Sequence, residues 1–147
     1  MFKHILVPTD GSKLSAKAAK QAVKLAKTLG ARVTGFYAVP DYSSTYYGDG
    51  YILRAPSAKT QAEQSQNEAR KCLSVIEVEA ALEKVACAVF HTISDSPYEA
   101  IIDAAKKKKC DLIVMASHGR RGLSAMVLGS ETQKVLVHSK IPVLVCR

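Results

Sequence analysis

Short apolar runs alternate with longer helix-like segments along the whole chain, and this alternation restricts the fold more than any other feature. Residues 2–7 form an apolar-rich run, which is typical of a strand buried on both faces of a parallel sheet. Similar runs predict strands at 32–39, 87–92, 111–116 and 141–146, with helices at 13–29, 57–85, 97–108 and 130–138. We therefore predict an α/β protein with a single doubly wound, five-stranded parallel sheet, Rossmann-like, with helices on both faces.

The expected helix ends carry recognisable capping residues. Gly30 is the predicted stop of the first helix, and Asp10 or Ser12 is its predicted cap. In Ser96-Pro97-Tyr98-Glu99, serine is expected to cap the third helix, with proline in the first turn and glutamate reaching back to the cap. The pattern Ser130-x-x-Gln133 predicts another capping box, at the start of the last helix.

The formal net charge of +8 raises the question of a nucleic-acid partner. The lysines are, however, distributed as expected for a solvated exterior. Five lie on one face of the first helix, opposite an apolar face, and four lie at the end of the third helix, where positive charge suits the helix dipole. We therefore do not expect a dedicated nucleic-acid surface; these residues are Lys13, Lys17, Lys20, Lys24, Lys27 and Lys106 to Lys109.

Length and composition limit the remaining classes of protein. A chain of 147 residues suffices for one domain, which we predict to span residues 1–147. No apolar stretch is long enough to span a membrane. The first apolar run ends at Pro8, too early for a signal peptide, so we expect a cytoplasmic location. The histidines form no metal-binding pattern, and the widely spaced cysteines predict buried, reduced thiols: Cys72, Cys87, Cys110 and Cys146.

Two strand ends carry residues suited to ligand binding. Pro8-Thr9-Asp10 follows the first strand, and the glycine-containing segment 116–130 follows the fourth. Glycines at a strand-to-helix junction let the backbone approach an anion closely, and amides at the helix start can then hold a phosphate without a lysine. If the first and fourth strands are neighbours, the two loops face one crevice at the carboxyl edge of the sheet. A nucleotide is therefore the leading ligand.

The spacing within segment 116–130 resembles that of a known family. Ala116-x-x-Gly119 is followed by nine residues and then by Gly129-Ser130. Together with the opening Ile5-Leu6-Val7-Pro8-Thr9-Asp10 and the closing Ile141-Pro142-Val143-Leu144-Val145, this makes the whole chain similar to the universal stress proteins, whose nucleotide-binding members carry G-x-x-G, nine residues, then G-S or G-T. The resemblance implies the strand order 3-2-1-4-5, bound ATP (or AMP or ADP) with Mg²⁺, and a homodimer formed through strand 141–146.

The same resemblance implies roles for individual residues. Asp10, after Pro8 and Thr9, would lie near the ribose and the phosphates or their metal ion, and Val39 would meet the adenine through its backbone. By charge alone, Arg120 and Arg121 are natural phosphate partners. The remaining candidates border the site (Met115 and His118) or would hold the phosphates (Gly119, Gly129, Ser130 and, as a further candidate, Thr132).

Ala116 departs from the family pattern, which has glycine at this position. If the backbone there needs a positive φ, alanine costs about 1 kcal/mol or more. If the residue is simply the last of its strand, the methyl group is tolerated, and this is what we expect. The other positions also have purely structural explanations. The glycines and Ser130 would be turn and capping residues, and Asp10 would be a helix cap.

No catalytic motif accompanies the predicted nucleotide site. The P-loop pattern is absent, and Gly122-Leu123-Ser124-Ala125-Met126 lacks the second glycine of a nucleophile elbow. We therefore expect a nucleotide-binding protein that is not an enzyme and hydrolyses ATP slowly at most. The family points to a stress-response sensor or regulator that acts through nucleotide occupancy and an unknown protein partner. The alternatives are a nucleotide-free, stress-protective interaction protein and a slow ATPase.

Two segments suggest further contacts. The last strand is apolar on both faces, and such a strand at a sheet edge invites pairing with a second copy of the chain, in agreement with the dimer that the family implies. Residues 41–56 hold tyrosines that would stack on a base, meet a partner or simply lie on a surface loop: Tyr42, Tyr46, Tyr47 and Tyr51.

Overall fold

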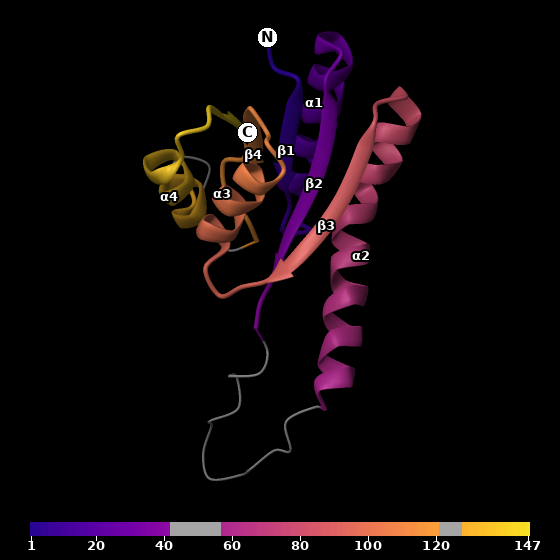
Figure 1. Cartoon of the computed structure of the whole chain (residues 1–147), viewed down its shortest axis with the longest axis vertical. Helices are drawn as coiled ribbons and strands as arrows, with labels where there is room; N and C mark the ends of the chain where they lie inside the picture. Colours follow the sequence, from indigo (N-terminus) through magenta and orange to yellow (C-terminus); the bar gives the residue numbers. More distant parts are fainter. Residues whose placement is uncertain (42–56, 121–127) are drawn as a thin grey trace.

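The computed structural model describes residues 1–41, 57–120 and 128–147. The elements in these ranges are β1 His4–Pro8, α1 Lys13–Leu29, β2 Arg32–Val39, α2 Ala58–Glu83, β3 Cys87–Ile93, α3 Pro97–Lys107, β4 Leu112–Ala116, α4 Ser130–His138 and β5 Val143–Cys146 (Figure 1). The strands form one parallel sheet in the order β3-β2-β1-β4-β5. Both the predicted fold class and the predicted strand order are confirmed.

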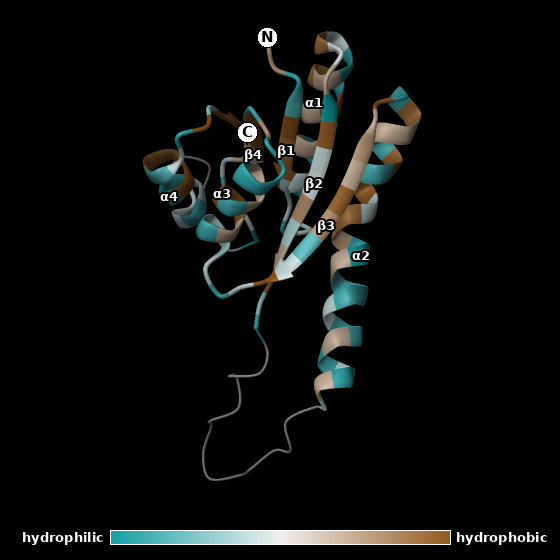
Figure 2. Cartoon of the chain, viewed as in Figure 1, coloured by the Kyte–Doolittle hydropathy of each residue, from teal (hydrophilic) through white to brown (hydrophobic). Residues whose placement is uncertain are grey.

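Two helices cover each face of the sheet: α1 and α2 one face, α3 and α4 the other (Figure 1). Side chains alternate along β1, so that Ile5 and Val7 lie under α1 and α2, whereas Leu6 lies under α3 and α4. All three are fully buried, which explains why this central strand is apolar on both faces. The amino-terminal half of α2 projects beyond the strands and is mainly hydrophilic, as suits its solvated position (Figure 2).

Several element ends agree with the predicted caps. Ser12 is the N-cap of α1, and Gly30 ends this helix in the left-handed conformation, with φ 63°. The first and last strands begin later than predicted. The Asp111 carboxylate accepts hydrogen bonds from the amides of Lys3, which precedes β1, and His4, its first residue. The Ser139 hydroxyl accepts one from the Ile141 amide, before β5 begins.

Ser96 is the N-cap of α3 and Pro97 lies in its first turn, as predicted, but neither of the two predicted capping boxes is formed. The Ser96 side chain makes no capping bond; the Tyr98 amide of α3 donates instead to Glu131 Oε2 at 2.9 Å. A carboxylate is a stronger acceptor than a hydroxyl, and this one arrives from α4, so no local pattern announces it. At α4 the N-cap is Gly129, Ser130 is the first helical residue, and the Gln133 side chain donates to the Leu128 carbonyl.

Most charged and thiol side chains lie where the sequence predicts. The lysine face of α1 is exposed, and two of its lysines form ion pairs with Glu79 and Glu83 of α2, at 3.0 and 2.5 Å. All four cysteines are free thiols, but Cys87 is exposed, contrary to prediction, because β3 is an edge strand that the helices cover incompletely. Among the described residues, no helix has both the length and the apolar character needed to cross a membrane.

Candidate functional site

The carboxyl ends of β1 and β4 lie side by side at the centre of the sheet, because these two strands pair directly. From here the chain continues to α1 on one face and to α4 on the other, the arrangement in which α/β proteins bind ligands. A cavity of about 550 Å³ opens at this point. Most predicted site residues line it: Pro8, Thr9, Asp10, Met115, Ala116, His118, Gly119, Arg120, Gly129, Ser130 and Thr132.

Asp10 connects the two loops that face one another across this cavity. Its Oδ1 accepts a hydrogen bond from the Ser12 amide at 3.0 Å, and its Oδ2 accepts one from the Arg120 amide at 2.8 Å. Burial alone would raise the pKa of the Asp10 carboxyl, but the hydrogen bonds from Ser12 and Arg120 outweigh burial and hold the pKa below its ordinary value. Asp10 is therefore a carboxylate at neutral pH, and each oxygen retains a lone pair for a further donor or a cation.

Gly119 and Gly129 lie in close contact with neighbouring residues of the site. A Cβ at position 119 would lie 2.3 Å from Asp10 Oδ2, which is far inside van der Waals contact. The Gly129 amide donates to the Ser117 carbonyl at 2.8 Å, and a Cβ there would lie 3.0 Å from the His118 Cα. A larger residue at 119 would force Asp10 or the loop after β4 to move, and one at 129 would crowd the His118 backbone.

The first turn of α4 lies at the cavity wall. Its first intrahelical bond runs from the Gln133 amide to the Gly129 carbonyl, at 3.0 Å. The amides of residues 130–132 precede this bond and have no carbonyl within the helix, so they are placed to receive an anion. Thr132 has a structural role instead. It is buried, and its hydroxyl donates a hydrogen bond to the Ala116 carbonyl at 3.0 Å, so that α4 is held against β4.

β4 ends in two buried residues, Met115 and Ala116, that both line the cavity. Ala116 is the last strand residue and pairs with Cys146 of β5, so its methyl group causes no left-handed strain, as expected. Next to it, the His118 ring Nδ1 lies 3.1 Å from the Ser117 hydroxyl. Within the described part of the chain, no carboxylate is hydrogen-bonded to this ring.

Val39 is the one described site candidate that does not line the cavity. Its side chain is buried in the core under α1 and α2, and its carbonyl accepts the Ser94 amide at 2.8 Å. Its side chain shares this face with Tyr37, which does line the cavity, so strand alternation alone does not decide which residues of β2 reach it. The lining residues that the sequence analysis missed are Ser15, Phe36, Tyr37, Ala38, Pro40, Asp95, Pro97, Ile101 and Glu131. Arg121 and the four loop tyrosines lie outside the described residues.

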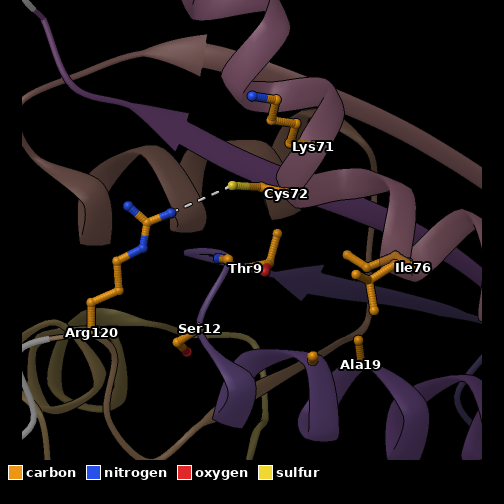
Figure 3. Close-up of a pocket in the computed structure, with 10 residues that line it drawn as sticks. Thr9, Ser12, Ala19, Lys71, Cys72, Ile76 and Arg120 are labelled. Atoms are coloured by element: carbon orange, nitrogen blue, oxygen red, sulfur yellow. Dashed lines mark hydrogen bonds between the residues drawn. The ribbon is translucent and has the colours of Figure 1, made fainter.

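A smaller cavity, of about 190 Å³, lies between α1 and α2 beside the loop after β1 (Figure 3). Arg120 lines both cavities, and its Nη2 lies 3.7 Å from the Cys72 Sγ, the contact drawn as a dashed line in Figure 3. Gly11, with φ 76°, makes room for this contact, because a Cβ there would lie 2.7 Å from the sulfur and 2.8 Å from Nη2. The Arg120 guanidinium therefore lies on the α2 side of the loop, which no sequence pattern indicated.

The described residues contain no group of three or more His, Cys, Asp or Glu side chains that could hold a metal ion by themselves. A cation at Asp10 would therefore need oxygen ligands from a bound molecule as well. Phosphate oxygens are the usual partners of this kind for Mg²⁺.

Comparison with known proteins agrees with this geometry. The family model for the universal stress protein family matches residues 1–147. Universal stress protein YxiE of Bacillus subtilis is 35% identical, with 100% of each chain covered. Universal stress protein UspA from Lactobacillus plantarum has a solved structure that is 25% identical, covers 99% of this chain and 98% of its own, and superposes with a TM-score of 0.75. The universal stress protein from Archaeoglobus fulgidus in complex with dAMP shares the fold at 15% identity, with a TM-score of 0.69 and coverage of 100% and 98%.

Proposed function

The chain belongs to the universal stress protein family, and we propose that it binds an adenine nucleotide, principally ATP with Mg²⁺, in the cavity at the ends of β1 and β4. One observation carries this proposal. The close packing of Gly119 and Gly129 leaves the first-turn amides of α4 beside a cavity whose volume suits a small-molecule ligand. The dAMP bound by the Archaeoglobus fulgidus protein supports the choice of an adenine nucleotide.

Each part of the ligand has a matching part of the cavity. The phosphates would bind the α4 amides and the Ser130 hydroxyl. Asp10 would contact the ribose or share Mg²⁺ with the phosphates, because a carboxylate beside a triphosphate needs a cation or a hydroxyl between them. The apolar wall formed by Ala38 and Ile101 would receive the adenine.

The proposed role is that of a stress-response regulator whose nucleotide occupancy alters a contact with another protein. His118 is hydrogen-bonded to Ser117, and among the described residues no carboxylate orients its ring. The histidine is therefore not positioned as a general base, so hydrolysis of bound ATP would be slow. The strand conformation of Ala116 supports nucleotide binding over the alternative of a nucleotide-free interaction protein, because the methyl group at this position brings no backbone strain. We place the protein in the cytoplasm as one domain of residues 1–147, since four free thiols suit a reducing compartment.

Isothermal titration of the purified protein with Mg-ATP and with AMP tests the proposal. We expect saturable binding of one nucleotide per chain in the larger cavity, with a dissociation constant on the order of micromolar. A Lys140→Ser variant, altered at the opposite edge of the sheet, serves as the control and should bind equally well. Absence of saturable binding for both nucleotides would refute the proposal.

We also propose that β5 forms a homodimer with β5 of a second copy. Among the described strands, β5 pairs only with β4 and so has a free edge. Exposed apolar side chains lie on β5 and on the neighbouring helix α4: Leu136 at 40%, Val137 at 76% and Leu144 at 44% exposure. Such side chains next to a free strand edge suit an interface between identical chains.

Replacing Leu144 with lysine is expected to shift the dimer to monomer, because two like charges would meet near the symmetry axis of the paired strands. Light scattering coupled to size-exclusion chromatography measures the mass. Leu82→Lys is the matched control, since Leu82 is 73% exposed but lies on α2, away from β5, and this variant should remain dimeric. A wild-type chain that stays monomeric, or a Leu144→Lys variant that stays dimeric, would contradict the β5 interface.

A further inference from the structure

Glu131 occupies an unusual position in the candidate nucleotide site. It is the second residue of α4, it lines the larger cavity, and its own amide is one of the first-turn amides proposed to receive phosphate. Its Oε2 accepts the Tyr98 amide at 2.9 Å, and its Oε1 accepts the Lys134 Nζ at 2.9 Å. The family motif ends at the preceding Gly129-Ser130, so it assigns nothing to this carboxylate.

The Glu131 carboxylate lies at the amino terminus of α3, where the unpaired amides and the helix dipole attract anions. The Ser96 side chain makes no capping bond and Pro97 has no amide hydrogen, so the Tyr98 amide is the one that Glu131 satisfies. The amino termini of α3 and α4 therefore meet at the partly exposed Glu131 carboxylate, beside the cavity that both helices line. A phosphate bound to the first turn of α4 would have to share this region with the carboxylate.

The acidic side chains that line the cavity add to the repulsion between Glu131 and a bound phosphate. Among the described residues that line it, Asp10, Asp95 and Glu131 are acidic, and Arg120 is the only lysine or arginine. The Arg120 guanidinium is turned to Cys72 on the α2 side. Lys134 offsets part of the Glu131 charge from the surface. Each phosphate added to a bound nucleotide therefore increases repulsion within the described part of the cavity.

We propose that Glu131 is a specificity residue that penalises each additional phosphate, and so makes the binding of ATP, more than that of AMP, dependent on a divalent cation. This inference rests on the proposed nucleotide-binding function. Mg²⁺ relieves the penalty because, when bound to the nucleotide, it neutralises the charge of the added phosphates and so reduces their repulsion by the Glu131 carboxylate. AMP, which brings a single phosphate, experiences the smallest penalty.

The test compares the affinities of AMP, ADP and ATP for the wild-type chain and for Glu131→Gln, each with EDTA and with Mg²⁺. The glutamine oxygen still accepts the Tyr98 amide, so the cap of α3 is preserved. In EDTA we expect the variant to gain about threefold to tenfold in affinity for each phosphate beyond the first, and to show little of this gain in Mg²⁺. A gain that is equal for AMP, ADP and ATP, or no gain, would overturn the inference.

Lys134→Met provides an independent variant of opposite sign. It leaves Glu131 in place but removes the ion pair at 2.9 Å, so in EDTA it should weaken ATP binding more than AMP binding. If it weakens neither, or both equally, the inference is refuted even where Glu131→Gln folds poorly. If neither the wild-type chain nor Glu131→Gln binds any of the three nucleotides, the proposed function itself fails, and this inference falls with it.

Discussion

Replacement of Gly119 with alanine should weaken adenine-nucleotide binding by about tenfold to hundredfold, since it disrupts a hydrogen bond to a charged group that contributes about 1.5–3 kcal/mol. The added Cβ would lie 2.3 Å from Asp10 Oδ2, so one of the two loops must move. The Asp10 carboxylate cannot retreat without losing its bonds to the Ser12 or Arg120 amides, at 3.0 and 2.8 Å. Titration calorimetry with Mg-ATP measures the effect.

Gly30→Ala is the matched control for this substitution. A Cβ at Gly30 meets no atom within 4 Å, but φ is 63°, so alanine should cost about 1–2 kcal/mol in stability through left-handed strain. This variant lies at the far end of α1 from the cavity and should bind nucleotide as tightly as the wild-type chain. If Gly119→Ala also binds like the wild-type chain, the contact between Asp10 and the loop after β4 does not shape the site.

Replacement of Ile76 with alanine should lower the free energy of unfolding by about 2–5 kcal/mol. Ile76 is fully buried on α2 and packs directly over Gly35 of β2, where a Cβ would lie only 2.9 Å from Ile76 Cδ1. The absence of a side chain at Gly35 lets the helix approach the sheet, so truncation of Ile76 leaves a space that no neighbour on β2 can fill. The smaller cavity, which Ile76 also lines, would enlarge. Urea or guanidinium unfolding measures the change.

Val78→Ala on the same helix is the control for Ile76→Ala. Val78 is 57% exposed, so its truncation should change stability by less than about 0.5 kcal/mol. Ile76→Ala should retain nucleotide affinity at temperatures where it remains folded, because Ile76 does not line the larger cavity. Equal destabilisation by the two variants would contradict the packing of α2 on the sheet described here.

Features with a periodic or local cause were predictable from the sequence. The apolar run that contains Ile5 and Val7 predicted a strand buried on both faces, because such burial allows no polar alternation. Ser12 and Gly30 predicted the ends of α1 because both caps act within a few residues. The two loops of the site were also predicted, since the ends of neighbouring parallel strands meet at one edge.

Features that depend on contacts between distant segments were not predictable. At the start of α3 the Tyr98 amide donates to Glu131 and not to the Ser96 hydroxyl, because tertiary packing delivers a stronger acceptor than the local hydroxyl. The contact between Arg120 and Cys72 joins the loop after β4 to α2, and no local pattern records it. The backbone contact of Val39 with adenine, which the family implied, stays a prediction; alternation along β2 turns its side chain into the core under α1 and α2.

The measurement that tests the central claim most directly is a ¹H–¹⁵N NMR titration with Mg-ATP, because it reports both whether the nucleotide binds and where. We expect saturable shifts, at one nucleotide per chain, for the amides of Gly119 and residues 129–132, together with Asp10 and its neighbours in the loop after β1. Absence of saturable shifts would contradict the claim. So would shifts confined to residues 71–76 of α2, beside the smaller cavity, because the nucleotide would then bind between α1 and α2.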